Sequence, residues 1–151
     1  LGDVYKRQDK DNALELHFMG TAIPNLNKYG INHGRYKRGD FNKVIAEINP
    51  SFIAILSTCP ETFSHTLTES WKSGIPVIAT NIGALKERVN KTGGGWLVDY
   101  KNPQKIYDKI LSIDETDYLE KVENISKINF KSLKEMTDEY NKIYGEMSDE
   151  L

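Results

Sequence analysis

Residues 52–80, FIAILSTCPETFSHTLTESWKSGIPVIAT, hold two short apolar segments with a helical pattern between them. The first segment, residues 52–57, is a nearly continuous apolar run of strand length. Such a run is typical of a central parallel strand covered on both faces. A helix is expected over about 64–73, with Gly74 as the residue that ends it, and residues 76–80 form a second buried strand. This order predicts a βαβ unit and therefore a parallel sheet.

The same alternation of strands and helices continues on the amino-terminal side. Residues 14–19 have the pattern of a strand, and a loop leads from them to a short segment around residues 29–36. Asp40 can cap a helix whose apolar residues recur at helical spacing. Asn49 and Pro50 stop that helix, because proline cannot continue the backbone hydrogen bonding.

On the carboxyl-terminal side, residues 85–90 predict one or two helical turns, and three glycines at 93–95 lead into a short strand at 96–98. The tail, residues 102–147, has three apolar stripes at helical spacing, which are expected to cover one face of the sheet. Strands separated by helices of this length predict an α/β fold with a doubly wound, Rossmann-like parallel sheet. Residues 14–151 are expected to form one domain.

Composition narrows the class of protein. The chain has 151 residues, and 20 Lys+Arg against 22 Asp+Glu give a net charge of −2, which argues against a nucleic-acid-binding protein. The single cysteine, Cys59, excludes an internal disulfide and is expected to be a small buried residue. The longest apolar run, residues 52–56, is far shorter than the roughly 20 residues of a membrane span, so a cytoplasmic protein is expected. Residues 1–13 are polar and are predicted to be a disordered or non-native leader.

The loop that follows the first strand of the opening stretch is the strongest candidate for a ligand site. In doubly wound sheets, ligands bind beyond the carboxyl ends of the strands. Ser64 is expected to cap the following helix, whose first-turn N–H groups then form an anion site suited to phosphate. Glu61 precedes the helix and Glu69 lies inside it, which places the two carboxylates roughly 10 Å apart. This spacing suggests a nucleoside diphosphate joined to a sugar, with one glutamate for the ribose hydroxyls and one for the sugar hydroxyls.

These residues also carry a resemblance to a known family. Glu61 and Glu69 match the E-x7-E motif of family-4-like (group 1) glycosyltransferases, enzymes of the two-domain GT-B fold. The resemblance continues without interruption over residues 52–89 and includes GGGWLV at 93–98, and in all it covers about residues 14–112. The chain therefore resembles the carboxyl-terminal, donor-binding domain of such an enzyme.

The resemblance implies a role for each residue around the loop. Glu69 would hold the ribose hydroxyls, and Glu61 would contact the donor sugar, which makes it the catalytic candidate. The backbone at Thr62, Phe63 and Ser64 would meet the sugar and the phosphates. Without the surrounding match, both glutamates would be interpreted as solvated carboxylates.

A second group of residues resembles the family's base-contacting loop. Gly34, Arg35 and Tyr36 are expected at the end of a short strand, where they would contact the nucleotide base. The family's donor domain also opens with a further strand and with an Arg and a Lys that neutralise the diphosphate. Nothing before Leu14 matches that segment, so the fold is expected to lack its first strand.

The resemblance also implies the ligands and partners. A nucleoside-diphosphate sugar is the expected substrate, and neither a metal nor another cofactor is expected. The family's amino-terminal acceptor domain has no match in the chain. In the two-domain fold a carboxyl-terminal helix often crosses back onto the other domain, so the resemblance also implies an alternative for the tail, in which Tyr140 and Tyr144 are exposed. We therefore expect part of a hexosyltransferase for polysaccharide or glycoconjugate synthesis, inactive by itself, whose full-length form can associate peripherally with a membrane.

Two other classes of function are compatible with a parallel sheet. A dinucleotide or flavin module would carry G-x-G-x-x-G after a strand, and no strand is followed by it. A noncatalytic, flavodoxin-like or nucleotide-binding interaction module would not need the glutamate pair. The base, the sugar, the acceptor and the stereochemical outcome are not determined by the sequence.

Overall fold

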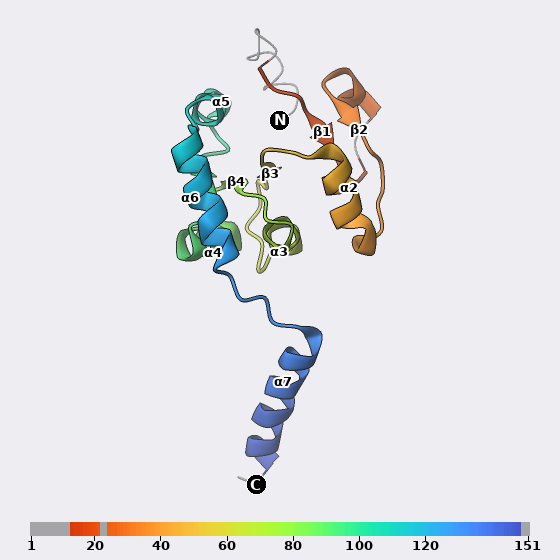
Figure 1. The fold of residues 1–151 in the computed structure, drawn as a ribbon, viewed down its shortest axis with the longest axis vertical. Helices are drawn as coiled ribbons and strands as arrows, with labels where there is room; N and C mark the ends of the chain where they lie inside the picture. The colour runs from red at the N-terminus through yellow and green to blue at the C-terminus, as the bar shows by residue number, and fades with distance from the viewer. Residues whose placement is uncertain (1–12, 22–23, 149–151) are drawn as a thin grey trace.

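The computed structural model describes residues 13–21 and 24–148, so nearly all of the predicted leader lies outside the described residues. The elements are β1 (His17–Phe18), η1 (Pro24–Lys28), β2 (Ile31–Asn32), η2 (Arg38–Asp40), α2 (Phe41–Ile48), β3 (Ile53–Ile55), α3 (His65–Lys72), β4 (Val77–Thr80), α4 (Gly83–Thr92), β5 (Gly95–Val98), α5 (Pro103–Leu111), α6 (Glu115–Ser126) and α7 (Leu133–Ser148). In Figure 1, β1, β2 and α2 lie on one side of β3, and α4, α5 and α6 lie on the other. The alternating order of strands and helices confirms the predicted α/β class.

All strands are parallel, and the described residues form two separate sheets. The larger sheet has the order β3-β4-β5, with Ile53 paired to Val77 and Val77 paired to Gly95. The smaller sheet pairs β1 with β2. The expectation that residues 52–57 form the central strand is wrong, because β3 is an edge strand and β4 is central and fully buried. The side of β3 away from β4 borders an apolar groove of about 780 Å³ that residues around β1 also line.

Helices cover both faces of the three-stranded sheet. Val77 and Ala79 of β4 face a core built with α3, α4 and α6, whereas Ile78 faces a core built with α5. Successive side chains of a strand point to opposite faces, so one strand serves both cores. The larger core contains Leu67 and Trp71 of α3, both almost fully buried. The doubly wound arrangement predicted from the sequence is therefore present.

The turn between α3 and β4 has the predicted form. Gly74 follows the helix, its N–H donates to the carbonyl of Trp71 at 3.0 Å, and the N–H of Ile75 donates to the carbonyl of Ser70 at 3.1 Å. These two bonds satisfy carbonyls that the end of the helix leaves open. The chain is thereby turned directly into β4.

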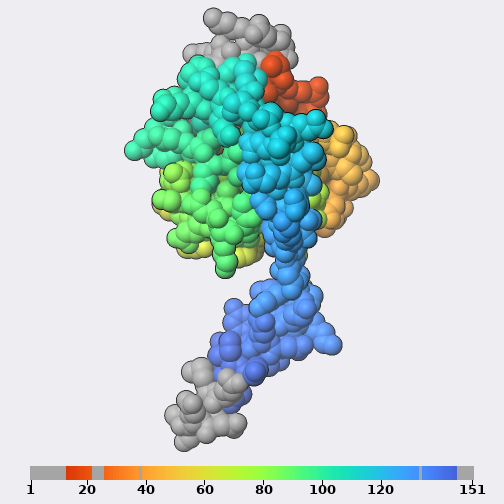
Figure 2. Space-filling model, turned by 60° about the vertical axis from the view of Figure 1, so that its left-hand side comes forward, coloured from red at the N-terminus to blue at the C-terminus, as the bar shows by residue number. Residues whose placement is uncertain are grey.

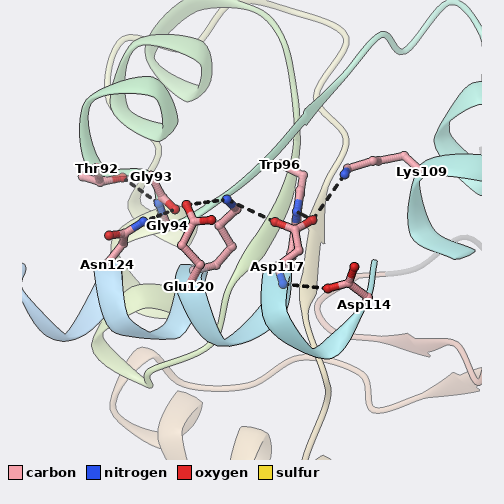
Figure 3. Close-up of polar contacts among 10 residues, drawn as sticks. Thr92, Gly93, Gly94, Trp96, Lys109, Asp114, Asp117, Glu120 and Asn124 are labelled. Carbon is pink, nitrogen blue, oxygen red and sulfur yellow. Dashed lines mark hydrogen bonds and ion pairs between the residues drawn. The ribbon is translucent and has the colours of Figure 1, made fainter. Parts of the chain in front are cut away.

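A polar network attaches α6 to β5 (Figure 3). The indole Nε1 of Trp96 donates to Oδ2 of Asp117 at 2.7 Å, and the ammonium groups of Lys109 and Lys121 lie 3.4 and 3.2 Å from the same carboxylate. Desolvation by burial raises the pKa of Asp117, but the hydrogen bonds from Trp96 and Lys121 and both lysine charges outweigh it and lower that pKa. The ionised carboxylate thus holds α6 on the sheet.

The helical tail departs from its prediction at α7. Ile106 of α5 and Ile125 of α6 are buried against the sheet, on opposite faces. By contrast, α7 extends away from the sheet (Figures 1 and 2) and leaves a stripe of large apolar side chains exposed. These exposed side chains are Met136, Tyr140, Ile143 and Tyr144. The prediction that all three stripes cover one face of the sheet is therefore wrong, because α5 and α6 cover opposite faces and α7 extends away from both. The exposure of Tyr140 and Tyr144 agrees with the alternative arrangement of the tail.

Candidate functional site

The loop between β3 and α3 reaches the amino end of α3 as predicted, with one difference at Ser64. This residue occupies the cap position, but its φ of 61° and ψ of 92° lie in left-handed backbone space, and its side chain makes no capping hydrogen bond. A capping residue ordinarily has an extended backbone, from which its oxygen reaches the first-turn N–H groups. The expected capping bond is therefore absent, and the first-turn N–H groups of α3 lack a serine cap.

The backbone of Glu61 is fixed by the start of α4. Its carbonyl accepts the N–H of Ala84 at 3.0 Å. A Cβ added at Gly83 would lie 3.0 Å from the Glu61 carbonyl oxygen and 3.1 Å from Cα of Pro60, and Gly83 has a φ of +49°. Both the close approach and the positive φ favour glycine. The backbone of Glu61 therefore contacts α4 directly, and its side chain is half-buried.

The beginning of the loop is held by the end of β4. The hydroxyl of Thr80, which is fully buried, donates to the carbonyl of Ser57 at 2.7 Å. The hydroxyl of Ser57 donates to the carbonyl of Cys59 at 2.9 Å. Cys59 itself is exposed, contrary to its prediction, because it lies in the turn beyond the last residue of β3, Ile55.

Arg88 of α4 is a site residue that the sequence analysis missed. Its guanidinium donates to the carbonyls of Phe63 and Ser64 and to the hydroxyl of Thr68. The available signal was the spacing of four between Ala84 and Arg88, which places both on the face of α4 that meets this loop. Thr80 of β4 and Ala84 and Arg88 of α4 all donate hydrogen bonds to this loop. One β4–α4 unit therefore holds the loop from Ser57 to Ser64.

Glu69 of α3 is half-buried and borders a hollow of about 370 Å³. The hollow lies between α3 and the start of α2, and its remaining lining residues are Gly39, Phe41, Asn42, His65, Thr68 and Lys72. It therefore combines a phenyl ring, an imidazole ring, one carboxylate and one ammonium group. Glu61 is not among its lining residues, so the two glutamates face different surroundings.

Gly34, Arg35 and Tyr36 follow β2, which already ends at Asn32. The N–H of Gly34 donates to the side chain of Asn32 at 3.0 Å, and Nε of Arg35 donates to the hydroxyl of Thr21 at 2.9 Å. The ring of Tyr36 contacts Phe41, a lining residue of the hollow, with 5.7 Å between ring centroids. The structure thus links this predicted base loop to the hollow through one aromatic contact.

Within residues 13–21 and 24–148, no three His, Cys, Asp or Glu side chains are grouped so that they could hold a metal ion. No helix in the same part of the chain is both long enough and apolar enough to cross a membrane.

Sequence comparison identifies relatives of this chain. Residues 3–115 match the family model described as glycosyl transferases group 1, and this match begins within the segment predicted to be a leader. Over 83 residues the chain is 30% identical to WcaC of Escherichia coli (strain K12), which is named as a colanic acid biosynthesis glycosyl transferase. That alignment covers 55% of this chain but 20% of WcaC, so the chain corresponds to a small part of that relative.

Solved structures with the same fold include two chains that are longer than this one. Anabaena Alr3699/HepE, solved in complex with UDP and glucose, is 20% identical with a TM-score of 0.60, over 80% of this chain and 36% of HepE. The glycosyltransferase from Rickettsia africae ESF-5 is 23% identical with a TM-score of 0.64, over 97% of this chain and 43% of that protein. The fold is that of a GT-B glycosyltransferase domain, and the family match shows that this chain belongs to the group 1 glycosyl transferases.

Proposed function

We propose that this chain binds a nucleotide-activated sugar, as the donor half of a hexosyltransferase that builds a polysaccharide or glycoconjugate. The observation that carries the proposal is that Glu69 of α3 borders a hollow. The amino end of the same helix adjoins the loop that contains Glu61. Membership of the group 1 glycosyl transferases, the UDP and glucose bound to HepE, and the biosynthetic name of WcaC support the same substrate class.

The hollow is suited to the nucleoside part of the donor. Its volume of about 370 Å³ lies within the range of small-molecule sites. The carboxylate of Glu69 can accept two hydrogen bonds from ribose hydroxyls, and bonds to an ionised acceptor are the stronger kind. Phe41 offers an apolar wall for the base, and Tyr36 in the predicted base loop packs against that wall.

The diphosphate is assigned to the amino end of α3. The helix leaves N–H groups there without intrahelical partners, and its dipole favours an anion. The backbone at Thr62, Phe63 and Ser64 leads directly into that end, and Glu61 precedes it toward the sugar. No metal is assigned to the site, since backbone N–H groups can bind phosphate without one.

We propose that the 151 residues alone bind the donor but do not catalyse sugar transfer. Much of the rate enhancement of a transferase comes from holding donor and acceptor together. HepE and the Rickettsia africae protein are each more than twice as long as the segment that matches this chain, so transfer is assigned to a longer protein.

Calorimetry with UDP, GDP and ADP, and with the glucose conjugate of each, tests this assignment. Glu69→Ala should weaken binding of the preferred free nucleotide by at least about tenfold, because hydrogen bonds to a charged group contribute roughly 1.5 to 3 kcal/mol. Glu61→Ala should leave the free nucleotide nearly unaffected and weaken only the nucleotide sugar. Glu47→Ala, an exposed glutamate on α2, should change neither affinity.

The ratio of the two affinities decides the outcome. Circular dichroism of each variant should show an unchanged fold, because both glutamates are only half-buried. Equal losses for nucleotide and nucleotide sugar in Glu61→Ala, or no loss in Glu69→Ala, would contradict the assigned roles. Absence of binding by the unaltered chain to all six ligands would contradict the proposed function itself.

A further inference from the structure

Arg88 connects three parts of the molecule through one guanidinium group. Its Nη1 atom donates to the carbonyl of Phe63 at 2.6 Å and to the carbonyl of Ser64 at 2.9 Å, and its Nη2 atom donates to the hydroxyl of Thr68 at 2.8 Å. Arg88 belongs to α4, the two carbonyls belong to the loop before α3, and Thr68 lies within α3. A single side chain therefore fixes the loop relative to both helices.

The guanidinium is also held between two aromatic rings. Its central carbon lies 4.3 Å from the ring centroid of Phe63 and 5.3 Å from that of Trp71. Trp71 is buried and donates its indole N–H to the carbonyl of Gly94 at 2.8 Å, so this ring is anchored in the core. Cations over aromatic rings are stabilised by the ring quadrupole, most of all when partly desolvated. The position of Arg88 is thus set by the core, and Arg88 in turn sets the position of Phe63.

The bond to Ser64 coincides with an unfavourable backbone conformation. Ser64 has a φ of 61°, a region that residues with a side chain seldom occupy without support from their surroundings. The carbonyls of Phe63 and Ser64, on either side of the Ser64 N–Cα–C unit, both accept from the same nitrogen of Arg88. Arg88 therefore opposes relaxation of this turn toward an ordinary capping conformation.

An arginine beside a phosphate site ordinarily binds the phosphate itself. Here three of the five N–H groups of the Arg88 guanidinium, two on Nη1 and one on Nη2, donate to two carbonyls and a hydroxyl of the chain. Burial also lowers the pKa of the guanidinium, consistent with a group turned toward the protein. The contacts of Arg88 therefore indicate that it holds the loop in place.

We infer that Arg88 is a positioning residue for the nucleotide-sugar site. It holds the backbone of Phe63 and Ser64 in place before the ligand arrives, so that the amino end of α3 already has its binding geometry. This inference rests on the proposed function. A preorganised site binds more tightly, because less ordering remains to be done on binding.

The test compares Arg88→Lys and Arg88→Ala with the unaltered chain and with Lys86→Ala, which removes an exposed cation from the same helix. Backbone amide NMR shifts are recorded without ligand, and calorimetry uses UDP-, GDP- and ADP-glucose with the three free nucleotides. Lysine retains the charge but cannot reproduce the forked hydrogen bonds of a guanidinium. Both Arg88 variants should shift the amide signals of residues 62–66 and lower the affinity for the nucleotide sugar by about tenfold. Lys86→Ala should change neither the signals nor the affinity.

Chemical rescue separates positioning from general destabilisation. Guanidinium ion at low millimolar concentration should restore most of the affinity lost in Arg88→Ala, and methylammonium should not. Arg88→Lys preserves the test if the alanine variant does not fold. Unchanged loop signals in Arg88→Lys, or shifted signals with unchanged affinity, would overturn the role of Arg88 and leave the proposed function standing. If the unaltered chain binds none of the nucleotides, the proposed function fails, and the positioning role that rests on it fails too.

Discussion

The two loops assigned to opposite ends of the donor differ in how they are held. The loop over residues 57–64 is fixed by the hydroxyl of Thr80, the N–H of Ala84 and the guanidinium of Arg88, all from one β4–α4 unit. The loop over residues 34–36 belongs to the small β1–β2 sheet, where the carbonyl of Gly34 accepts the N–H of Gly20 at 2.8 Å, and the ring of Tyr36 contacts Phe41 of α2. The first loop is hydrogen-bonded to the central strand of the three-stranded sheet and to the helix that follows it. The second loop belongs to a separate two-stranded sheet.

This difference separates the two halves of ligand recognition. The main sheet fixes the end of the site assigned to the diphosphate and sugar, because the loop there bonds directly to a central strand and the following helix. The base end belongs to the β1–β2 sheet, which within the described residues pairs with no strand of the larger sheet and is separated from β3 by the groove of about 780 Å³. Side-chain contacts such as that of Tyr36 with Phe41 are less directional than a hydrogen-bonded strand pair. We therefore expect changes in the first loop to affect stability more than comparable changes in the second.

The largest contrast is expected between two glycine substitutions. Gly83 and Gly34 both have positive φ, but a Cβ at Gly83 would meet backbone atoms of Glu61 and Pro60, whereas a Cβ at Gly34 would meet open space. Gly34→Ala should lower the free energy of unfolding by about 1 kcal/mol, the cost of the left-handed backbone. Gly83→Ala adds the cost of overlap and should lower it by about 3 kcal/mol. Urea unfolding of the ligand-free proteins measures both values.

The same pair of variants can contradict the comparison. Equal losses in Gly83→Ala and Gly34→Ala would mean that the loop before α3 adjusts as freely as the base loop. The m-value should stay constant in both variants, which confirms that stability and not the denatured state has changed.

A smaller effect is expected at Thr80. Thr80→Val preserves the shape of this fully buried side chain but removes the hydroxyl that donates to the carbonyl of Ser57. A carbonyl left without its partner in a partly buried place costs about 1 to 2 kcal/mol. Thr80→Ser retains the hydroxyl and should therefore lose less stability than Thr80→Val, despite its missing methyl group. The reverse order in thermal unfolding would show that the methyl contact, and not the hydrogen bond, holds this end of the loop.

The sequence predicted what depends on local pattern. The helix after the loop, its end at Gly74, the β4 strand and the turn into β5 all follow from apolar spacing and from turn residues, and the structure confirms them. The edge position of β3 could not be predicted, because an apolar run does not reveal how many neighbours a strand has. The backbone of Ser64 was mispredicted for a related reason. Its carbonyl accepts a hydrogen bond from Arg88, 24 residues away in the sequence, whereas capping rules consider only neighbouring residues.

The residues of the candidate site also include some that local sequence pattern identifies and some that it does not. The neighbourhood of Glu69 is assembled from α2 and α3, and no local pattern predicts that Asn42 and Lys72 line the same hollow. The roles of Glu61 and Glu69 stay predictions, since they concern a ligand and not the fold. The sequence thus identified candidate groups, and the structure adds what holds them.

The smallest effect is expected for Arg35→Ala in the base loop. Arg35 is exposed, and its guanidinium makes one described hydrogen bond, to the hydroxyl of Thr21. Surface changes of this kind alter the free energy of unfolding by less than about 0.5 kcal/mol. If the loop contacts the base through backbone groups, nucleotide affinity should change by less than about threefold. A tenfold loss with unchanged stability would show that the Arg35 side chain itself contacts the ligand. Loss of stability near that of Thr80→Val would instead show that the β1–β2 unit is held as firmly as the loop before α3, and the contrast between the two loops would no longer stand.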